Sequence, residues 1–89
     1  AFVIMPGGFG TLDELFEAVT LIQTGKIRNF PVVLMGHAYW DGLLAWMRAV
    51  QLPMGVIAQA DLDLLTVTDD PAEAVALITA YEKANGLEP

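Results

Sequence analysis

The sequence predicts an α/β fold in which three parallel strands alternate with three helices. Two apolar runs rich in β-branched residues, Ala1–Met5 and Val32–Met35, are typical of strands that are buried on both faces. Segments with apolar residues at helical spacing follow these runs, and strands joined through helices lie parallel with right-handed crossovers. The predicted order is therefore strand, helix, strand, helix, strand, helix.

The first unit is a strand, a glycine-rich loop and a helix. The strand Ala1–Met5 is followed directly by the loop Pro6–Gly10, which interrupts the apolar run. From Thr11 onward, apolar residues recur at helical spacing until Gly25 supplies a stop. This spacing predicts a helix of about four turns.

The second unit begins at the strand Val32–Met35. Asp41 is expected to cap a helix that extends to Val50. The next stretch, Leu52–Gln59, contains a proline and a glycine and is expected to be a loop. Residues 60–65 are expected to form one short helical turn.

The third unit is a short strand at Thr66–Thr68 and a final helix. Asp70 followed by Pro71 is a strong helix start, because the aspartate can cap the helix and proline suits its first position. The helix is expected to run to about Ala84 and to end at Asn85–Gly86.

Composition limits the possible partners and location. The net charge is −7 with only four basic residues, so no basic surface is available to bind a nucleic acid. The sequence has no cysteine, which fits a reducing compartment, and we expect a cytoplasmic protein. No apolar stretch approaches the roughly 20 residues of a membrane span, so we expect no membrane partner.

The chain is rich in apolar residues for its size. Hydrophobic residues make up 55% of its 89 residues, and a parallel sheet of three strands is small for a free-standing domain. We therefore expect residues 1–89 to be the C-terminal portion of one larger domain, with a missing N-terminal half or a subunit contact covering part of its surface.

The glycine loop is the candidate binding site. Ligands of open α/β sheets bind at the carboxyl ends of strands, where this loop lies. Gly7, Gly8 and Gly10 are expected to adopt positive φ and to let a ligand approach closely. The N–H groups at the start of the following helix and the Thr11 hydroxyl would then hold a phosphate. Neither the Walker pattern nor the dinucleotide fingerprint fits.

A purely structural alternative exists for the same residues. Thr11 and Glu14 have the spacing of a capping box, in which Glu14 only satisfies an N–H group at the helix start. Residue chemistry alone does not distinguish this alternative from phosphate binding.

The segment Pro6-Gly7-Gly8-Phe9-Gly10-Thr11-Leu12-Asp13-Glu14 resembles the PGGxGTxxE signature of the LOG family, phosphoribohydrolases that activate cytokinins and were long labelled lysine decarboxylases. The similarity extends through most of the chain. It implies a three-layer Rossmann-like fold and hydrolysis of the N-glycosidic bond of AMP or an N6-modified adenosine 5′-monophosphate. The products would be the free base and ribose 5-phosphate.

The resemblance also implies roles for single residues. Gly7, Gly8, Gly10 and Thr11 would bind the substrate phosphate, and Glu14 would be the catalytic glutamate. No cofactor and no metal are implied, and the family resemblance implies a homodimer. The family uses an arginine in its N-terminal half that matches no residue here, so we expect these 89 residues alone to be inactive.

The chemistry of N-glycoside cleavage supports the role of Glu14. The reaction passes through an oxocarbenium-like state, which a nearby carboxylate stabilises. We expect Glu14 in the first helical turn, where the helix dipole favours its ionised form. Two alternative functions exist: a non-catalytic module that binds nucleotides or phosphate, and amino-acid decarboxylation. The second has no lysine placed as a Schiff-base partner.

Other polar and aromatic residues have structural explanations. His37 is a lone histidine without a cluster of ligands, which is usually structural. Tyr39 and Trp40 would flank a base pocket or anchor a core or interface, and the second role is favoured. Asp69 and Asp70 are explained by the start of the last helix rather than by a metal site.

Overall fold

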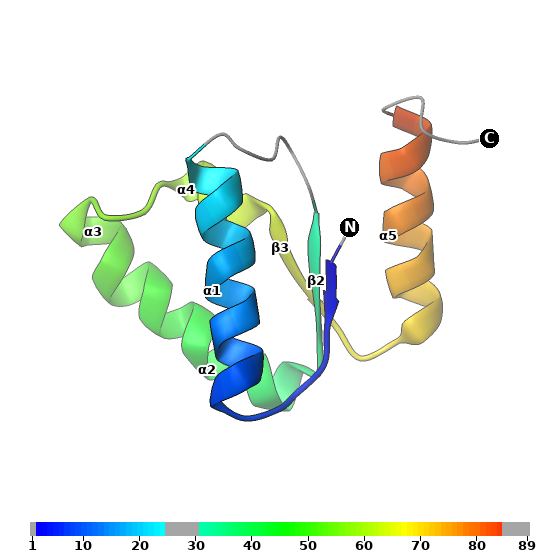
Figure 1. Cartoon of the computed structure of the whole chain (residues 1–89), viewed down its shortest axis with the longest axis horizontal. Helices are drawn as coiled ribbons and strands as arrows, with labels where there is room; N and C mark the ends of the chain where they lie inside the picture. Colours follow the sequence, from blue (N-terminus) through cyan, green and yellow to red (C-terminus); the bar gives the residue numbers. More distant parts are fainter. Residues whose placement is uncertain (1, 25–30, 85–89) are drawn as a thin grey trace.

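The computed structural model describes residues 2–24 and 31–84, which form a three-layer α/β structure (Figure 1). The strands are β1 (Phe2–Ile4), β2 (Val32–Met35) and β3 (Leu65–Thr68). The helices are α1 (Phe9–Gln23), α2 (His37–Trp46), the π-helical segment η1 (Met47–Gln51), α3 (Leu52–Met54), α4 (Gln59–Asp63) and α5 (Pro71–Ala84). The predicted alternation of strands and helices is confirmed.

The three strands form one parallel sheet in the order β1-β2-β3. The central strand pairs with both neighbours, with Val33 opposite Val3 on one side and opposite Thr66 on the other. All four residues of β2 are buried, as the continuous apolar run predicted. This register places the carboxyl ends of all three strands at one edge of the sheet.

Helices cover both faces of the sheet. On one face, α1 and α2 bury Leu15 and Trp40 against Val32 and Leu34. The helix α5 lies on the other face (Figure 1), where Ala74 packs in a smaller cluster with Val33 and Met35. Alternate residues of β2 thus point to opposite layers, as expected for a strand with two buried faces.

The start of α2 differs from the prediction. The helix begins at His37, not at Asp41, and its N-cap is Gly36. The carboxylate that serves this helix start comes from Asp69, whose Oδ1 accepts a hydrogen bond from the His37 N–H at 2.8 Å. The expectation that Asp41 caps the helix is wrong because a residue distant in sequence supplies the acceptor.

The predicted loop Leu52–Gln59 is partly helical. The chain passes from α2 through η1 into α3, and the Leu52 N–H donates to the Met47 carbonyl five residues earlier. The helix ends at Gly55, which has a left-handed φ of 77°. Proline near the start of this short helix therefore did not terminate it, and the glycine did.

The start of α5 agrees with its prediction. The Asp70 Oδ1 accepts a hydrogen bond from the Ala72 N–H at 2.9 Å, and Pro71 is the first helical residue. The predicted stops at Gly25 and Asn85–Gly86 lie outside the described residues.

Among the described helices, none has the length and apolar character needed to cross a membrane.

Candidate functional site

The glycine loop lies between the end of β1 at Ile4 and the start of α1 at Phe9. The first hydrogen bond of the helix runs from the Leu12 N–H to the Gly8 carbonyl at 3.2 Å. The N–H groups of Gly8, Phe9, Gly10 and Thr11 precede this bond and have no partner within the helix. They form an N-terminal group of donors at the carboxyl edge of the sheet, where an anion is favoured.

The glycines of the loop have ordinary backbone angles, and their contribution is the room left by their missing side chains. Positive φ occurs among the described glycines at Gly36 and Gly55, so the expected positive φ at Gly7, Gly8 and Gly10 is wrong. A Cβ added at Gly8 or Gly10 would meet no atom within 4 Å. The loop therefore leaves the helix start open for the close approach of a ligand.

At Gly7, in contrast, the neighbouring Thr11 side chain leaves no room for a Cβ. A Cβ at this position would lie 2.1 Å from the Thr11 Oγ1, because the threonine side chain folds back over the loop. Thr11 is the third residue of α1, and the N-cap is Gly8, which makes no side-chain capping bond. The alternative in which Thr11 and Glu14 form only a capping box is therefore wrong.

Glu14 lies in the second turn of α1, as its sixth residue. Its expected position in the first turn is wrong, and the dipole effect has largely faded at this distance from the helix end. The side chain is exposed at a hollow of about 270 Å³ beside the edge strand β1. The hollow is also lined by Phe2, Val3, Ile4, Glu17, Ala18 and Leu21.

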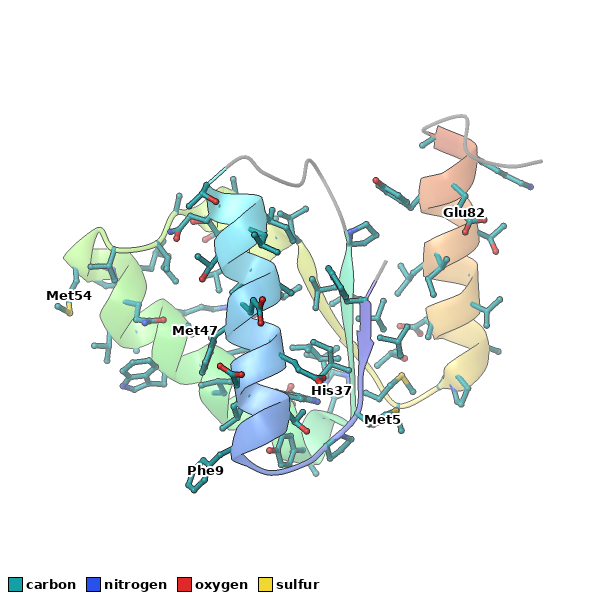
Figure 2. All side chains as sticks on the ribbon, viewed as in Figure 1. Met5, Phe9, His37, Met47, Met54 and Glu82 are labelled. Carbon is teal, nitrogen blue, oxygen red and sulfur yellow. The ribbon has the colours of Figure 1, made fainter. Side chains whose placement is uncertain are left out.

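The relation between Glu14 and the glycine loop follows from helical geometry. Residues four apart lie on the same side of a helix, so Glu14 is one turn beyond Gly10 on that side. The side chain of Phe9 instead projects away from the first turn of α1 (Figure 2) and is 90% exposed. The structure thus brings the open helix start and one carboxylate together on α1.

The start of α2 contacts the glycine loop. The Tyr39 hydroxyl donates a hydrogen bond to the Gly7 carbonyl, across 32 residues of sequence. Gly36 has a φ of 103°, and a Cβ there would lie 3.4 Å from the Pro6 Cγ. Trp40 is fully buried in the core, as its structural interpretation predicted. The contact of Tyr39 with the glycine loop was not predicted, because no local pattern reveals that the start of α2 meets this loop.

His37 takes part in a polar cluster at the same edge of the sheet. Its ring Nδ1 lies 3.0 Å from the Asp41 Oδ1. This hydrogen bond to Asp41 raises the pKa of His37, with smaller contributions from the charges of Asp41, Asp69 and Glu73, while partial desolvation opposes the rise. Within residues 2–24 and 31–84, no three His, Asp or Glu side chains converge to hold a metal ion.

Basic side chains are scarce around the loop. In the described part of the chain, the basic residues are Arg48 in η1 and Lys83 in the last turn of α5. Lys26 and Arg28 lie outside the described residues. The donors that the described site offers to an anion are therefore backbone N–H groups and the Thr11 hydroxyl.

These features define an α/β protein of Rossmann-like architecture with an open helix start at the carboxyl edge of its parallel sheet. Residues 1–78 match the family described as "Possible lysine decarboxylase". The chain belongs to this family, the LOG family expected from its glycine loop.

Two relatives carry the same enzyme name. The chain is 38% identical over 78 residues to a cytokinin riboside 5′-monophosphate phosphoribohydrolase of Mycobacterium tuberculosis, covering 84% of this chain and 40% of the relative. It is 34% identical over 83 residues to an enzyme of the same name from Arabidopsis thaliana, covering 91% of this chain and 37% of the relative. The chain thus spans about 40% of the length of these relatives.

Proposed function

We propose that this chain is the C-terminal portion of a nucleotide-binding domain that hydrolyses the N-glycosidic bond of AMP or an N6-modified adenosine 5′-monophosphate. The products are the free base and ribose 5-phosphate. The main support is the open start of α1, with Glu14 one turn further along the same helix. The names of the relatives point to the same reaction.

The phosphate is held at the N-terminus of α1. The N–H groups of Gly8, Gly10 and Thr11, together with the Thr11 hydroxyl, donate to phosphate oxygens. The open space at Gly8 and Gly10 admits these oxygens close to the backbone. Because the described part of the site offers backbone N–H groups and a hydroxyl as its donors, it favours a phosphate ester whose attached sugar adds further contacts.

Glu14 acts on the sugar. Cleavage breaks the bond between the ribose C1′ and the base nitrogen, and a water oxygen forms a new bond to C1′. The water supplies one hydrogen to the departing base and one hydroxyl to the sugar. Positive charge develops on the sugar ring in the transition state, and the Glu14 carboxylate stabilises it.

The hollow beside β1 supports a position within a larger domain. Val3 on the edge strand is 47% exposed. Val3 and Glu14 both line the hollow. An exposed apolar strand edge is normally covered in a folded protein. We infer that the rest of the domain lies against β1, and that two copies of the whole protein form a homodimer.

Amino-acid decarboxylation has weaker support. The lysine that the structure describes, Lys83, is in the last turn of α5, and this helix lies on the face of the sheet opposite α1 (Figure 1). Its amino group is not placed to form a Schiff base near the glycine loop.

Product analysis of the intact protein tests the proposal. The protein is incubated with AMP, with N6-isopentenyl-AMP and with adenosine, and the products are separated by liquid chromatography. Base and ribose 5-phosphate should appear from the monophosphates, with adenosine a poor substrate. Tight binding of AMP without any release of base would instead indicate a non-catalytic module, and release of carbon dioxide from lysine would contradict the proposal.

A further inference from the structure

The first turn of α2, which follows β2, contacts the glycine loop. The Tyr39 hydroxyl donates its hydrogen bond to the carbonyl of Gly7, one residue before the N-cap of α1. A carbonyl oxygen can only accept, so the tyrosine is the donor. The contact joins two of the three strand ends of the sheet.

The direction of the Gly7 carbonyl determines the direction of the next N–H group. No cis peptide bond occurs in the described residues, so the Gly7–Gly8 peptide is trans and planar. In such a peptide the C=O and N–H bonds point in opposite directions. With the Gly7 carbonyl directed at Tyr39, the Gly8 N–H points away from Tyr39.

A peptide between two glycines rotates easily, because neither residue has a Cβ to hinder it. If it flipped, the carbonyl oxygen would take the place of the Gly8 N–H and would repel an anion. Loss of the hydrogen bond to the tyrosine would therefore weaken phosphate binding without removing any group that touches the phosphate.

Tyr39 is itself firmly held. Its N–H donates to the Gly36 carbonyl at 3.1 Å, and its ring meets the ring of Trp40 edge to face at a centroid distance of 4.6 Å. Trp40 is fully buried, so the tyrosine is anchored on the core. Pro6 lies on the side of Gly36 where a side chain would be, since a Cβ built there would be 3.4 Å from the Pro6 Cγ.

We propose that Tyr39 is a positioning residue that keeps the Gly7–Gly8 peptide in the orientation that presents the Gly8 N–H to the substrate phosphate. This inference rests on the proposed function, because it assumes that the glycine loop binds the phosphate. It adds a residue outside the loop to the determinants of phosphate affinity.

The test uses Tyr39→Phe in the intact protein, with calorimetric titration of ribose 5-phosphate and of adenosine. Loss of one hydrogen bond should weaken ribose 5-phosphate binding about five-fold and leave adenosine binding unchanged. Tyr81→Phe, the same change on α5, is the control and should alter neither affinity. Unchanged ribose 5-phosphate affinity in Tyr39→Phe, or equal losses for both ligands, would overturn the proposal.

A measurement on the unmodified protein covers the case in which the variant does not fold. In an amide NMR titration with ribose 5-phosphate, the Gly8 signal should shift strongly, and an unmoved Gly8 signal contradicts the proposal. If the unmodified protein releases base from AMP but Tyr39→Phe retains full phosphate affinity, the positioning role alone fails. If it releases no base, the proposed function fails.

Discussion

Thr11 lies directly over Gly7, so that a Cβ on the glycine would be 2.1 Å from the threonine Oγ1. No real Cβ tolerates such a distance, so any side chain at position 7 must displace Thr11. The hydroxyl proposed to bind phosphate and the glycine beneath it therefore form one unit.

Gly7→Ala should consequently destabilise the intact protein, by about 1–3 kcal/mol, because an inserted methyl group forces a shift of the helix start. Gly10→Ala is the matched control, since a Cβ there meets no atom within 4 Å and position 10 is helical. The control should be neutral or stabilising by up to about 1 kcal/mol. Chemical denaturation measures both, and equal effects would disprove the crowding at Gly7.

Glu14→Gln should lower kcat for base release by at least about 100-fold, because the amide cannot stabilise positive charge on the sugar. Glu17→Gln is the control, since Glu17 lines the same hollow. Its kcat should change little. Ribose 5-phosphate affinity, measured by calorimetry, should be similar in both variants. A Glu14→Gln enzyme with an unchanged rate would remove this residue from the mechanism.

Gly36→Ala should destabilise the protein by about 1–3 kcal/mol, because its φ of 103° is strained for any residue with a side chain. Gly42→Ala within α2 is the comparison, since a Cβ there is free of contacts within 4 Å. That variant should gain up to about 1 kcal/mol. Thermal and chemical unfolding of both variants shows whether backbone strain at position 36, or the replacement of any glycine, lowers the stability.

His37 should titrate above its ordinary pKa, first because of its hydrogen bond with Asp41. A raised pKa in the folded state means that the stabilising pairing is complete below the pKa of the unfolded chain and is lost as pH rises through the folded value. NMR titration of the His37 ring should show this rise, and Asp41→Asn should lower the pKa. A ring that titrates identically in both proteins would exclude the pairing.

Much of the fold was predictable because it depends on local patterns. The apolar run at β2 and the helix start at Asp70 appear in the structure as expected. The start of α2 was misplaced because its acceptor is the distant Asp69, which only the folded chain brings near. The helical course through Leu52–Met54 differs from the predicted loop because Pro53 lies in the first turn of α3, where proline does not break a helix.

The candidate site also contains residues that the sequence predicts and one that only the folded structure reveals. Gly7, Gly8, Gly10 and Thr11 could be selected from their sequence pattern, and the structure places them together at an open helix start. The role of Tyr39 could not be foreseen, since residues 7 and 39 are distant in sequence and meet only when β1 and β2 pair.

By itself, the sequence determined the alternation of strands and helices and the glycine loop, because hydrophobic periodicity and backbone freedom act over a few residues. Tertiary structure decided where α2 begins, that Glu14 lines the hollow beside β1, and that Tyr39 contacts Gly7. These depend on which segments the parallel sheet brings to its carboxyl edge, and that is a property of packing rather than of any local stretch of chain.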